Sequence, residues 1–130
     1  MEMDLQINVR KNGTTRIIEL NGEVDAYTSA RFREIMLELI DDGGIDLIIN
    51  MCKVEYIDSS GLGALVGGLK RVSERDGKIM IVSDGPQIKK VFEITGLEKV
   101  FPIFDAEHAA VTALDQITNR NRGLVVDGEN

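Results

Sequence analysis

The sequence predicts an α/β domain, a mostly parallel sheet of four to five strands that opens with a β-hairpin and carries about four helices. Three observations lead to this class. Two alternating apolar segments, residues 5–9 and 16–20, flank Asn12-Gly13, which indicates an opening hairpin. Beyond residue 28, helical apolar stripes alternate with short apolar runs, as expected of helices that connect parallel strands. The 130 residues, 43% of them hydrophobic, suffice for one buried core.

The first helix is predicted from its caps and its apolar spacing. Thr28 or Ser29 can cap it, and Gly43-Gly44 can end it, because glycine adopts the left-handed conformation at low cost. Its inner stripe is Phe32, Ile35, Met36, Leu39 and Ile40. The apolar run 47–49 that follows suits a strand covered on both faces.

The second half of the chain repeats this pattern. A helix begins at Asp58-Ser59 and ends near Asp76-Gly77, and residues 79–82 are predicted as a strand. Pro86 suits the first position of a third helix, which Gly96 stops. Residues 100–104 are expected to form the last strand.

A final helix, capped by Asp105, is expected to complete a domain that spans residues 3–118. Residues 119–130 are polar apart from Leu124-Val125-Val126, and we expect them to form a flexible C-terminal tail.

The net charge and the small number of cysteines and histidines limit the kinds of function that we expect of the protein. The net charge of −7 argues against nucleic acid or an anionic membrane as partner and favours a basic protein. Cys52 and His108 are the only residues of their types, so they supply neither a disulfide nor a metal cluster, and no cofactor is expected. We expect Cys52 in the core and His108 on the surface. The start of the chain lacks the pattern of a signal peptide, so a cytoplasmic protein is expected.

The most informative stretch is Ile57-Asp58-Ser59-Ser60-Gly61-Leu62-Gly63, where a buried strand ends and a helix begins. A helix start presents unpaired N–H groups and a partial positive charge, so it can hold a phosphate on a hydroxyl. The simpler interpretation is that Asp58 or a serine only caps the helix. Asp25 follows an earlier strand, so it can share the rim of the sheet with Asp58 and Ser59. It can also be a turn residue that binds local N–H groups.

The helix that starts here contains four glycines, Gly61, Gly63, Gly67 and Gly68. They lower its intrinsic stability by about 4 kcal/mol relative to alanine. We expect that Ala64 and Gly68, with Ser60 or Gly61 one turn earlier, lie on the face opposite the leucines and form a shallow docking surface for a partner. Alternatively, individual glycines pack under another element of the same fold.

A phosphate on Ser59 would add a charge of about −1.5 to −2 beside Asp58. Our hypothesis is that this charge prevents a partner from binding without melting the helix.

Three motifs together resemble a known family. Gly22-Glu23-Val24-Asp25, the segment from Asp58 to Gly63, and Ile94-Thr95-Gly96-Leu97 resemble, in content, order and spacing, bacterial anti-sigma factor antagonists, the single-domain STAS proteins. The similarity covers about residues 3–118. Residues 119–130 run past the usual end of such a domain, and Gly67-Gly68 matches no motif of the family.

The resemblance implies a protein that switches partners. Its unmodified form would bind an anti-sigma factor, itself a serine kinase, and release a sigma factor. The kinase would phosphorylate Ser59, and a PP2C-type phosphatase would remove the phosphate. When free, the protein is expected to be a monomer. The expected partner-binding residues are Asp25, Asp58, Ser59, Ser60, Gly61, Leu62, Gly63, Ala64 and Gly67.

Three other functions fit the sequence less well. A receiver domain phosphorylated on Asp58 would need paired acids after its first strand, where this chain has a hairpin. A serine hydrolase lacks the Gly-x-Ser-x-Gly elbow, and only His108 could act as its base. A nucleotide-binding module would need a Walker lysine, which does not follow the helix start. The protein is therefore not expected to be an enzyme.

Overall fold

The computed structural model of the protein describes residues 4–121, and it confirms the predicted fold class. These residues form a five-stranded sheet in the order β1-β2-β3-β4-β5. β1 and β2 pair antiparallel, whereas β2, β3, β4 and β5 run parallel to one another. The strands are β1 (Leu5–Asn12), β2 (Thr15–Val24), β3 (Asp46–Ile57), β4 (Ile79–Val82) and β5 (Ile103–Phe104).

The opening hairpin turns through Gly13 and Thr14, because Asn12 pairs with Thr15 across the loop. Gly13 has a φ of 64°, the left-handed region that glycine tolerates at the first position of a two-residue hairpin loop. The predicted hairpin is therefore confirmed.

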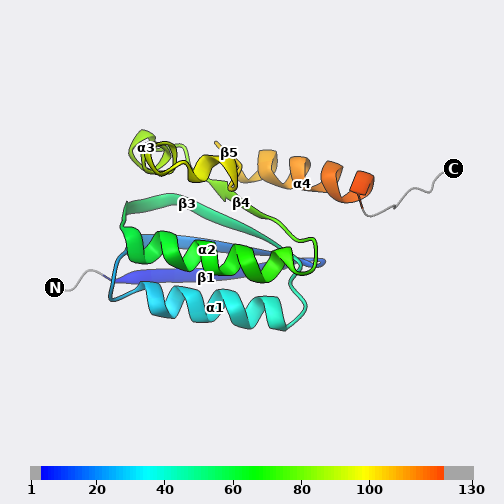
Figure 1. Ribbon diagram of the computed structural model, residues 1–130, viewed down its shortest axis with the longest axis horizontal. Helices are drawn as coiled ribbons and strands as arrows, with labels where there is room; N and C mark the ends of the chain where they lie inside the picture. Colours follow the sequence, from blue (N-terminus) through cyan, green and yellow to red (C-terminus); the bar gives the residue numbers. More distant parts are fainter. Residues whose placement is uncertain (1–3, 122–130) are drawn as a thin grey trace, which may run out of the picture.

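Helices cover both faces of the sheet. The helices are α1 (Ser29–Asp41), α2 (Ser59–Ser73), α3 (Pro86–Thr95) and α4 (Glu107–Asn121), with a short 3-10 helix η1 (Leu97–Lys99). α1, α2 and α3 supply residues to the larger core cluster, and α1 and α2 lie side by side (Figure 1). α4 packs on the opposite face, where Ala110 and Leu114 contact Ile48, Met80 and their neighbours. Because Ile48 and Ile49 belong to different clusters, the middle of β3 is covered on both faces, as expected.

The last strand is shorter than predicted. Residues 97–99 form η1 and only Ile103–Phe104 pair with β4. The chain therefore joins the sheet three residues later than the apolar pattern predicts. Pro102, just before β5, has no N–H that could donate a hydrogen bond to the neighbouring strand. The expectation that Asp105 caps the final helix is also wrong, since α4 begins at Glu107 and the Asp105 carboxylate pairs with Lys89.

Cys52 is exposed, so its assignment to the core is wrong. β3 continues beyond its doubly covered part, and Asn50 contacts Glu107 in the first turn of α4. Cys52 lies two residues further along the strand, past the beginning of that helix, so α4 leaves it exposed. His108 is exposed in the first turn of α4, as predicted.

α4 continues to Asn121, so residues 119–121, expected in the tail, extend this helix. The rest of the predicted tail, residues 122–130, lies outside the described residues. Within residues 4–121, no helix is long and apolar enough to cross a membrane.

Candidate functional site

The predicted rim exists: the loops that follow β2 and β3 start side by side. Val24 and Ile57, the last residues of the two strands, are paired in register. The Asp58 N–H donates a hydrogen bond to the Val24 carbonyl at 3.1 Å. Asp25 and Ser59 therefore leave the sheet from the same edge, as the strand order predicted.

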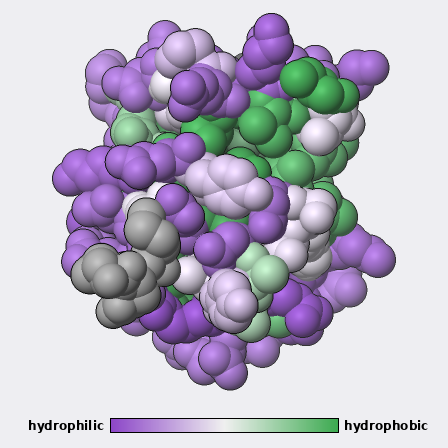
Figure 2. Space-filling model, turned by 90° about the vertical axis from the view of Figure 1, so that its left-hand side faces the viewer, coloured by the Kyte–Doolittle hydropathy of each residue, from purple (hydrophilic) through white to green (hydrophobic). Residues whose placement is uncertain are grey.

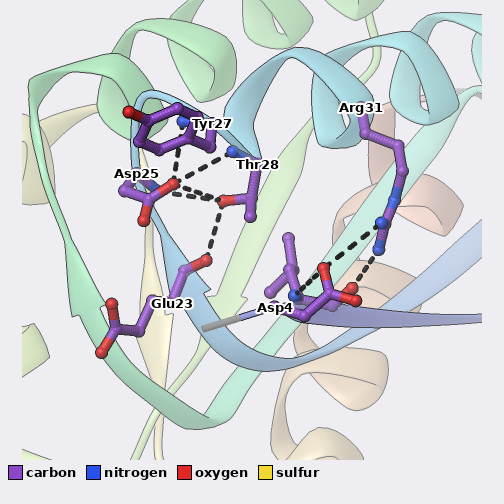
Figure 3. Close-up of polar contacts among 7 residues, drawn as sticks. Asp4, Glu23, Asp25, Tyr27, Thr28 and Arg31 are labelled. Atoms are coloured by element: carbon purple, nitrogen blue, oxygen red, sulfur yellow. Dashed lines mark hydrogen bonds and ion pairs between the residues drawn. The ribbon is translucent and has the colours of Figure 1, made fainter. Parts of the chain in front are cut away.

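Asp25 orders the loop between β2 and α1. One of its carboxylate oxygens, Oδ1, accepts hydrogen bonds from the N–H groups of Tyr27 at 2.9 Å and Thr28 at 3.0 Å (Figure 3). The Thr28 hydroxyl donates to the Glu23 carbonyl at 2.8 Å and accepts from the Asp25 N–H at 3.0 Å. Asp25 is thus the turn residue that one of the two interpretations described, and any contact it makes with a partner comes in addition to this structural role.

The loop is also tied to the start of the chain. The Arg31 guanidinium, in the first turn of α1, lies 3.6 Å from the Asp4 carboxylate and donates to the Leu5 carbonyl (Figure 3). These contacts hold the beginning of α1 against the beginning of β1.

Asp58 caps α2. Its backbone is extended, and its carboxylate accepts hydrogen bonds from the N–H groups of Ser60 at 2.9 Å and Gly61 at 3.3 Å. These are two of the N–H groups that a helix start leaves without an internal partner. Ser59 is the first residue of the helix, and both Ser59 and Ser60 are exposed. The capping role predicted for Asp58 is confirmed, and it leaves the Ser59 side chain at the surface.

The expectation of a shallow docking face built on Ala64 and Gly68, with Ser60 or Gly61, is wrong for Ala64, Gly68 and Gly61, because these three residues are buried, whereas Ser60 is exposed. A Cβ on Gly61 would lie 2.6 Å from Val24 Cγ1 and 2.7 Å from Ile57 Cγ1. A Cβ on Gly68 would lie 2.9 Å from the Met36 sulfur. Gly61 and Gly68 let α2 lie close to the sheet and to α1, and Ala64 belongs to the larger core cluster, so these three residues serve internal packing.

The exposed face of α2 carries other small residues. A Cβ on Gly63 would meet no atom within 4 Å, and one on Gly67 would have only Arg33 Nε as a neighbour, at 3.7 Å. Leu62 and Val66 pack against the core but are only half-buried. Of the predicted partner-binding residues of α2, Ser59, Ser60 and Gly63 are thus exposed, and Leu62 and Gly67 partly so.

Exposed tyrosines near the rim were missed by sequence reasoning. The Tyr27 side chain, in the loop held by Asp25, is 93% exposed, and Tyr56, next to the end of β3, is 48% exposed. Figure 2 shows the side of the molecule at which α1 and α2 begin, where most of the surface is hydrophilic and a smaller hydrophobic area extends to the right-hand edge of the view. Neither tyrosine belongs to the apolar stripe of a helix or strand. A large side chain outside any apolar stripe is the one signal in the sequence that could have identified these two exposed residues.

The rim is acidic. Glu23 and Asp25 lie at the end of β2, and Glu55 and Asp58 at the end of β3. Within residues 4–121, no three His, Cys, Asp or Glu side chains are grouped so that they could hold a metal ion. The arrangement offers an accessible hydroxyl beside carboxylates, which suits modification of the hydroxyl and contact with a basic partner.

A second polar cluster lies where α4 begins. The Glu107 carboxylate receives two hydrogen bonds from the Arg10 guanidinium, at 2.6 and 3.1 Å, and one from the Asn50 amide at 2.9 Å. The Arg10 contact, and to a lesser degree that of Asn50, lowers the Glu107 pKa. Burial is the main reason that the Cys52 pKa is raised, and the nearby Asp84 carboxylate adds to it. The hydrogen bonds of Glu107 with Arg10 and Asn50 connect α4 to β1 and β3.

The helices that hold Ser59 and His108 lie on opposite faces of the sheet. α2 belongs to the core cluster of one face and α4 to that of the other. A serine–histidine pair of the kind that a hydrolase needs is therefore not formed by these two residues.

The comparison with protein families decides the classification, because the model of the STAS domain matches residues 6–110. This chain belongs to the STAS domain family. The resemblance noted in the sequence is thereby confirmed.

Curated relatives extend this result. The STAS protein is 30% identical over 117 residues to the "Anti-sigma F factor antagonist" of Paenibacillus polymyxa. The aligned region covers 89% of this chain and 100% of the relative. It is 33% identical over 101 residues to the "Anti-sigma-B factor antagonist" of Staphylococcus aureus, covering 78% of this chain and 94% of the relative.

Solved structures share the fold. The anti-sigma factor antagonist SpoIIAA in its unphosphorylated form superposes with a TM-score of 0.72 at 24% identity, over 94% of this chain and 100% of that one. The phosphorylated form of SpoIIAA, from Bacillus, gives a TM-score of 0.67 at 24% identity, over 83% of this chain and 98% of that one.

Proposed function

We propose that this STAS protein is an anti-sigma factor antagonist regulated at Ser59. In the unmodified form it binds an anti-sigma factor that is a serine kinase, and a sigma factor is released. Phosphorylation of Ser59 abolishes this binding, and a PP2C-type phosphatase restores it. The names of both curated relatives support the antagonist role. The observation that carries the proposal is the exposed Ser59 at the first position of α2, directly after the Asp58 cap.

The structure suggests how a phosphate on Ser59 would act. It would add a charge of about −1.5 to −2 next to Asp58, whose carboxylate already accepts the Ser60 and Gly61 N–H groups. The phosphate therefore shares the helix start with an existing negative charge instead of replacing it as the cap. The dipole of α2 still favours negative charge at this end, so the helix remains folded.

Binding is lost at the surface. A partner that matches the unmodified site has to desolvate the phosphate and tolerate its charge, and both effects oppose association. A coupling of about 1–3 kcal/mol, a 5- to 150-fold change in affinity, is typical of such regulation.

The docking surface we propose combines the rim with the exposed face of α2. Ser59, Ser60 and Gly63 contribute directly, Leu62 and Gly67 contribute their exposed parts, and Asp25 and Asp58 order the two loops and add negative charge. Gly61 and Ala64 contribute only by bringing α2 close to the sheet. We further propose that the protein works in the cytoplasm and is a monomer when free.

The experiment uses purified protein, a candidate anti-sigma factor kinase and ATP. Mass spectrometry is expected to find one phosphate on Ser59 in the wild type and none in Ser59→Ala. The matched control is Ser60→Ala, which removes the neighbouring exposed hydroxyl and is expected to leave phosphorylation intact. Phosphate on Ser60 alone, or on Asp58 as an acid-labile acyl phosphate, would contradict the proposal and, in the latter case, favour a receiver-like domain.

A further inference from the structure

Arg33 differs from the other arginines of the folded domain in what its side chain binds. Most of the described arginine side chains are held by carboxylates or backbone carbonyls of the same molecule: Arg10, Arg16, Arg31, Arg71 and Arg75. Arg33, in the second turn of α1, is exposed and has no ion pair or side-chain hydrogen bond within residues 4–121. Its guanidinium is therefore available to an acceptor on another molecule.

The Arg33 side chain reaches from α1 to α2. Its Nε lies 3.7 Å from the position of a Cβ on Gly67, where it is the only neighbour within 4 Å. The two helices lie side by side (Figure 1). Gly67 belongs to the exposed face of α2 that we assign to the partner, so the guanidinium lies at the border of that docking surface.

The outer side of α1 is hollowed beside Arg33. A groove of about 500 Å³ is lined by Tyr27, Ala30, Arg31, Arg33, Glu34 and Leu37. Tyr27 is 93% exposed, and Asp25 holds its backbone N–H (Figure 3). Tyrosine and arginine are among the residue types that most often dominate the binding energy of an interface. A partner that extends from α2 over α1 therefore contacts both side chains.

In this position Arg33 serves the unmodified protein and not a phosphate on Ser59. Gly67 lies eight residues after Ser59 in the same helix, which is about 12 Å along the axis. A hydrogen bond joins atoms only about 3 Å apart, and side chains tilt toward the start of their helix, away from Gly67. The guanidinium over Gly67 and the modified hydroxyl are thus two separate features of the docking surface.

The surrounding charge indicates what Arg33 binds. The net charge is −7 and the rim carries Asp25 and Asp58, so an unpaired guanidinium is an isolated positive group on an acidic surface. Its planar fork matches the two oxygens of a carboxylate. We propose, on the basis of the antagonist function proposed above, that Arg33 is a specificity-determining residue that binds a carboxylate of the anti-sigma factor kinase. A basic partner with one acid at this place is held in a single register.

A series of substitutions at Arg33 tests this proposal through the affinity of a candidate kinase for the unmodified protein. Arg33→Ala is expected to weaken binding at least about tenfold. Arg33→Lys should recover only part of the loss, because an ammonium lacks the planar fork. Arg33→Glu should bind more weakly than Arg33→Ala, because it repels the carboxylate of the kinase.

The matched control is Lys99→Ala, which also removes one exposed positive charge. Lys99 lies in η1, which precedes β5, whereas Ser59 follows β3, so the two residues are at opposite ends of parallel strands. This control should bind the kinase as the wild type does.

The kinetics of Ser59 phosphorylation separate recognition from a structural role. Arg33→Ala should raise the KM for the protein substrate about as much as it raises the dissociation constant, with kcat unchanged, because Arg33 is remote from the reacting hydroxyl. Its midpoint in urea unfolding should equal that of the wild type, because Arg33 makes no polar contact within the described residues.

Four results would overturn the proposal. They are equal affinities of Arg33→Ala and the wild type, tighter binding of Arg33→Glu than of Arg33→Ala, a loss of affinity as large in Lys99→Ala, and a loss that accompanies a lower urea midpoint. If Ser59 is phosphorylated in every variant and one of these results is found, only the role of Arg33 is refuted. If the kinase does not phosphorylate Ser59 of the wild type, the proposed function fails, and this inference fails with it.

Discussion

Alanine at two glycines of α2 should have opposite effects on stability. Gly63→Ala places its methyl group in open space, since no atom lies within 4 Å of that position. Only the helix propensity changes, so unfolding should become about 1 kcal/mol more costly. Gly61→Ala gains the same propensity but forces its methyl group to 2.6 Å from Val24 and 2.7 Å from Ile57. Overpacking of this kind costs about 1–3 kcal/mol, so the net change is a loss of about 0–2 kcal/mol.

Urea unfolding of the wild type and both variants measures this difference, which should be about 1–3 kcal/mol between Gly63→Ala and Gly61→Ala. With slopes of about 1–3 kcal/mol per molar urea, the stabilised variant should unfold at a midpoint roughly 0.3–1 M above the wild type. If Gly61→Ala proves as stable as Gly63→Ala, our account of how α2 packs on the sheet is wrong.

The same pair of variants tests the docking surface. Gly63→Ala stabilises the free protein yet adds a methyl group to the face that we assign to the partner, so its affinity for the anti-sigma factor kinase should fall. Unchanged affinity in calorimetric titration would remove Gly63 from that surface.

Three further predictions concern single side chains. Asp58→Ala should lower the free energy of unfolding by about 1 kcal/mol, and Asp58→Asn should not, because asparagine also caps helices; equal losses in urea unfolding would argue against the cap. The hydrogen bond from Arg10 lowers the Glu107 pKa, so this group stabilises the fold above its unfolded-state pKa and the contribution disappears as the pH falls through the folded-state pKa. Glu107→Gln should therefore show a shallower loss of stability on acidification, and thermal melts with the same slope as the wild type would contradict this. The Cys52 residue is exposed, yet the partial burial of its thiol and the neighbouring Asp84 raise its pKa. Iodoacetamide should therefore label the folded protein more slowly than it labels free cysteine, and the labelling rate should increase as the pH rises. If Cys52 is labelled only after unfolding, it lies in the core after all.

Local signals in the sequence predicted most of the fold. Asp58 as a cap, Pro86 at the start of α3 and Gly96 after its end were all predicted, and the structure confirms them. Each of these depends on the backbone within a few residues, so the residue type alone carries the information. The strand order then brought Asp25 and Ser59 to one rim.

Features that depend on distant elements could not be predicted. The side of α2 that faces inward is decided by contacts of Gly61 and Gly68 with Val24 and Met36, which belong to other elements. An amphipathic pattern of leucines and glycines leaves either side available, because small residues allow close packing as readily as they leave a surface bare. Cys52 was misplaced for a related reason, since its exposure depends on where α4 begins.

The central claim is that the charge on Ser59 controls binding without unfolding the protein. The most direct test compares the affinity of the anti-sigma factor kinase for the unmodified protein and for the same protein stoichiometrically phosphorylated on Ser59, with circular dichroism of both. We predict a dissociation constant at least about fivefold higher for the phosphorylated form and superimposable spectra. Equal affinities, or a phosphorylated form that has lost its helical signal, would contradict the account.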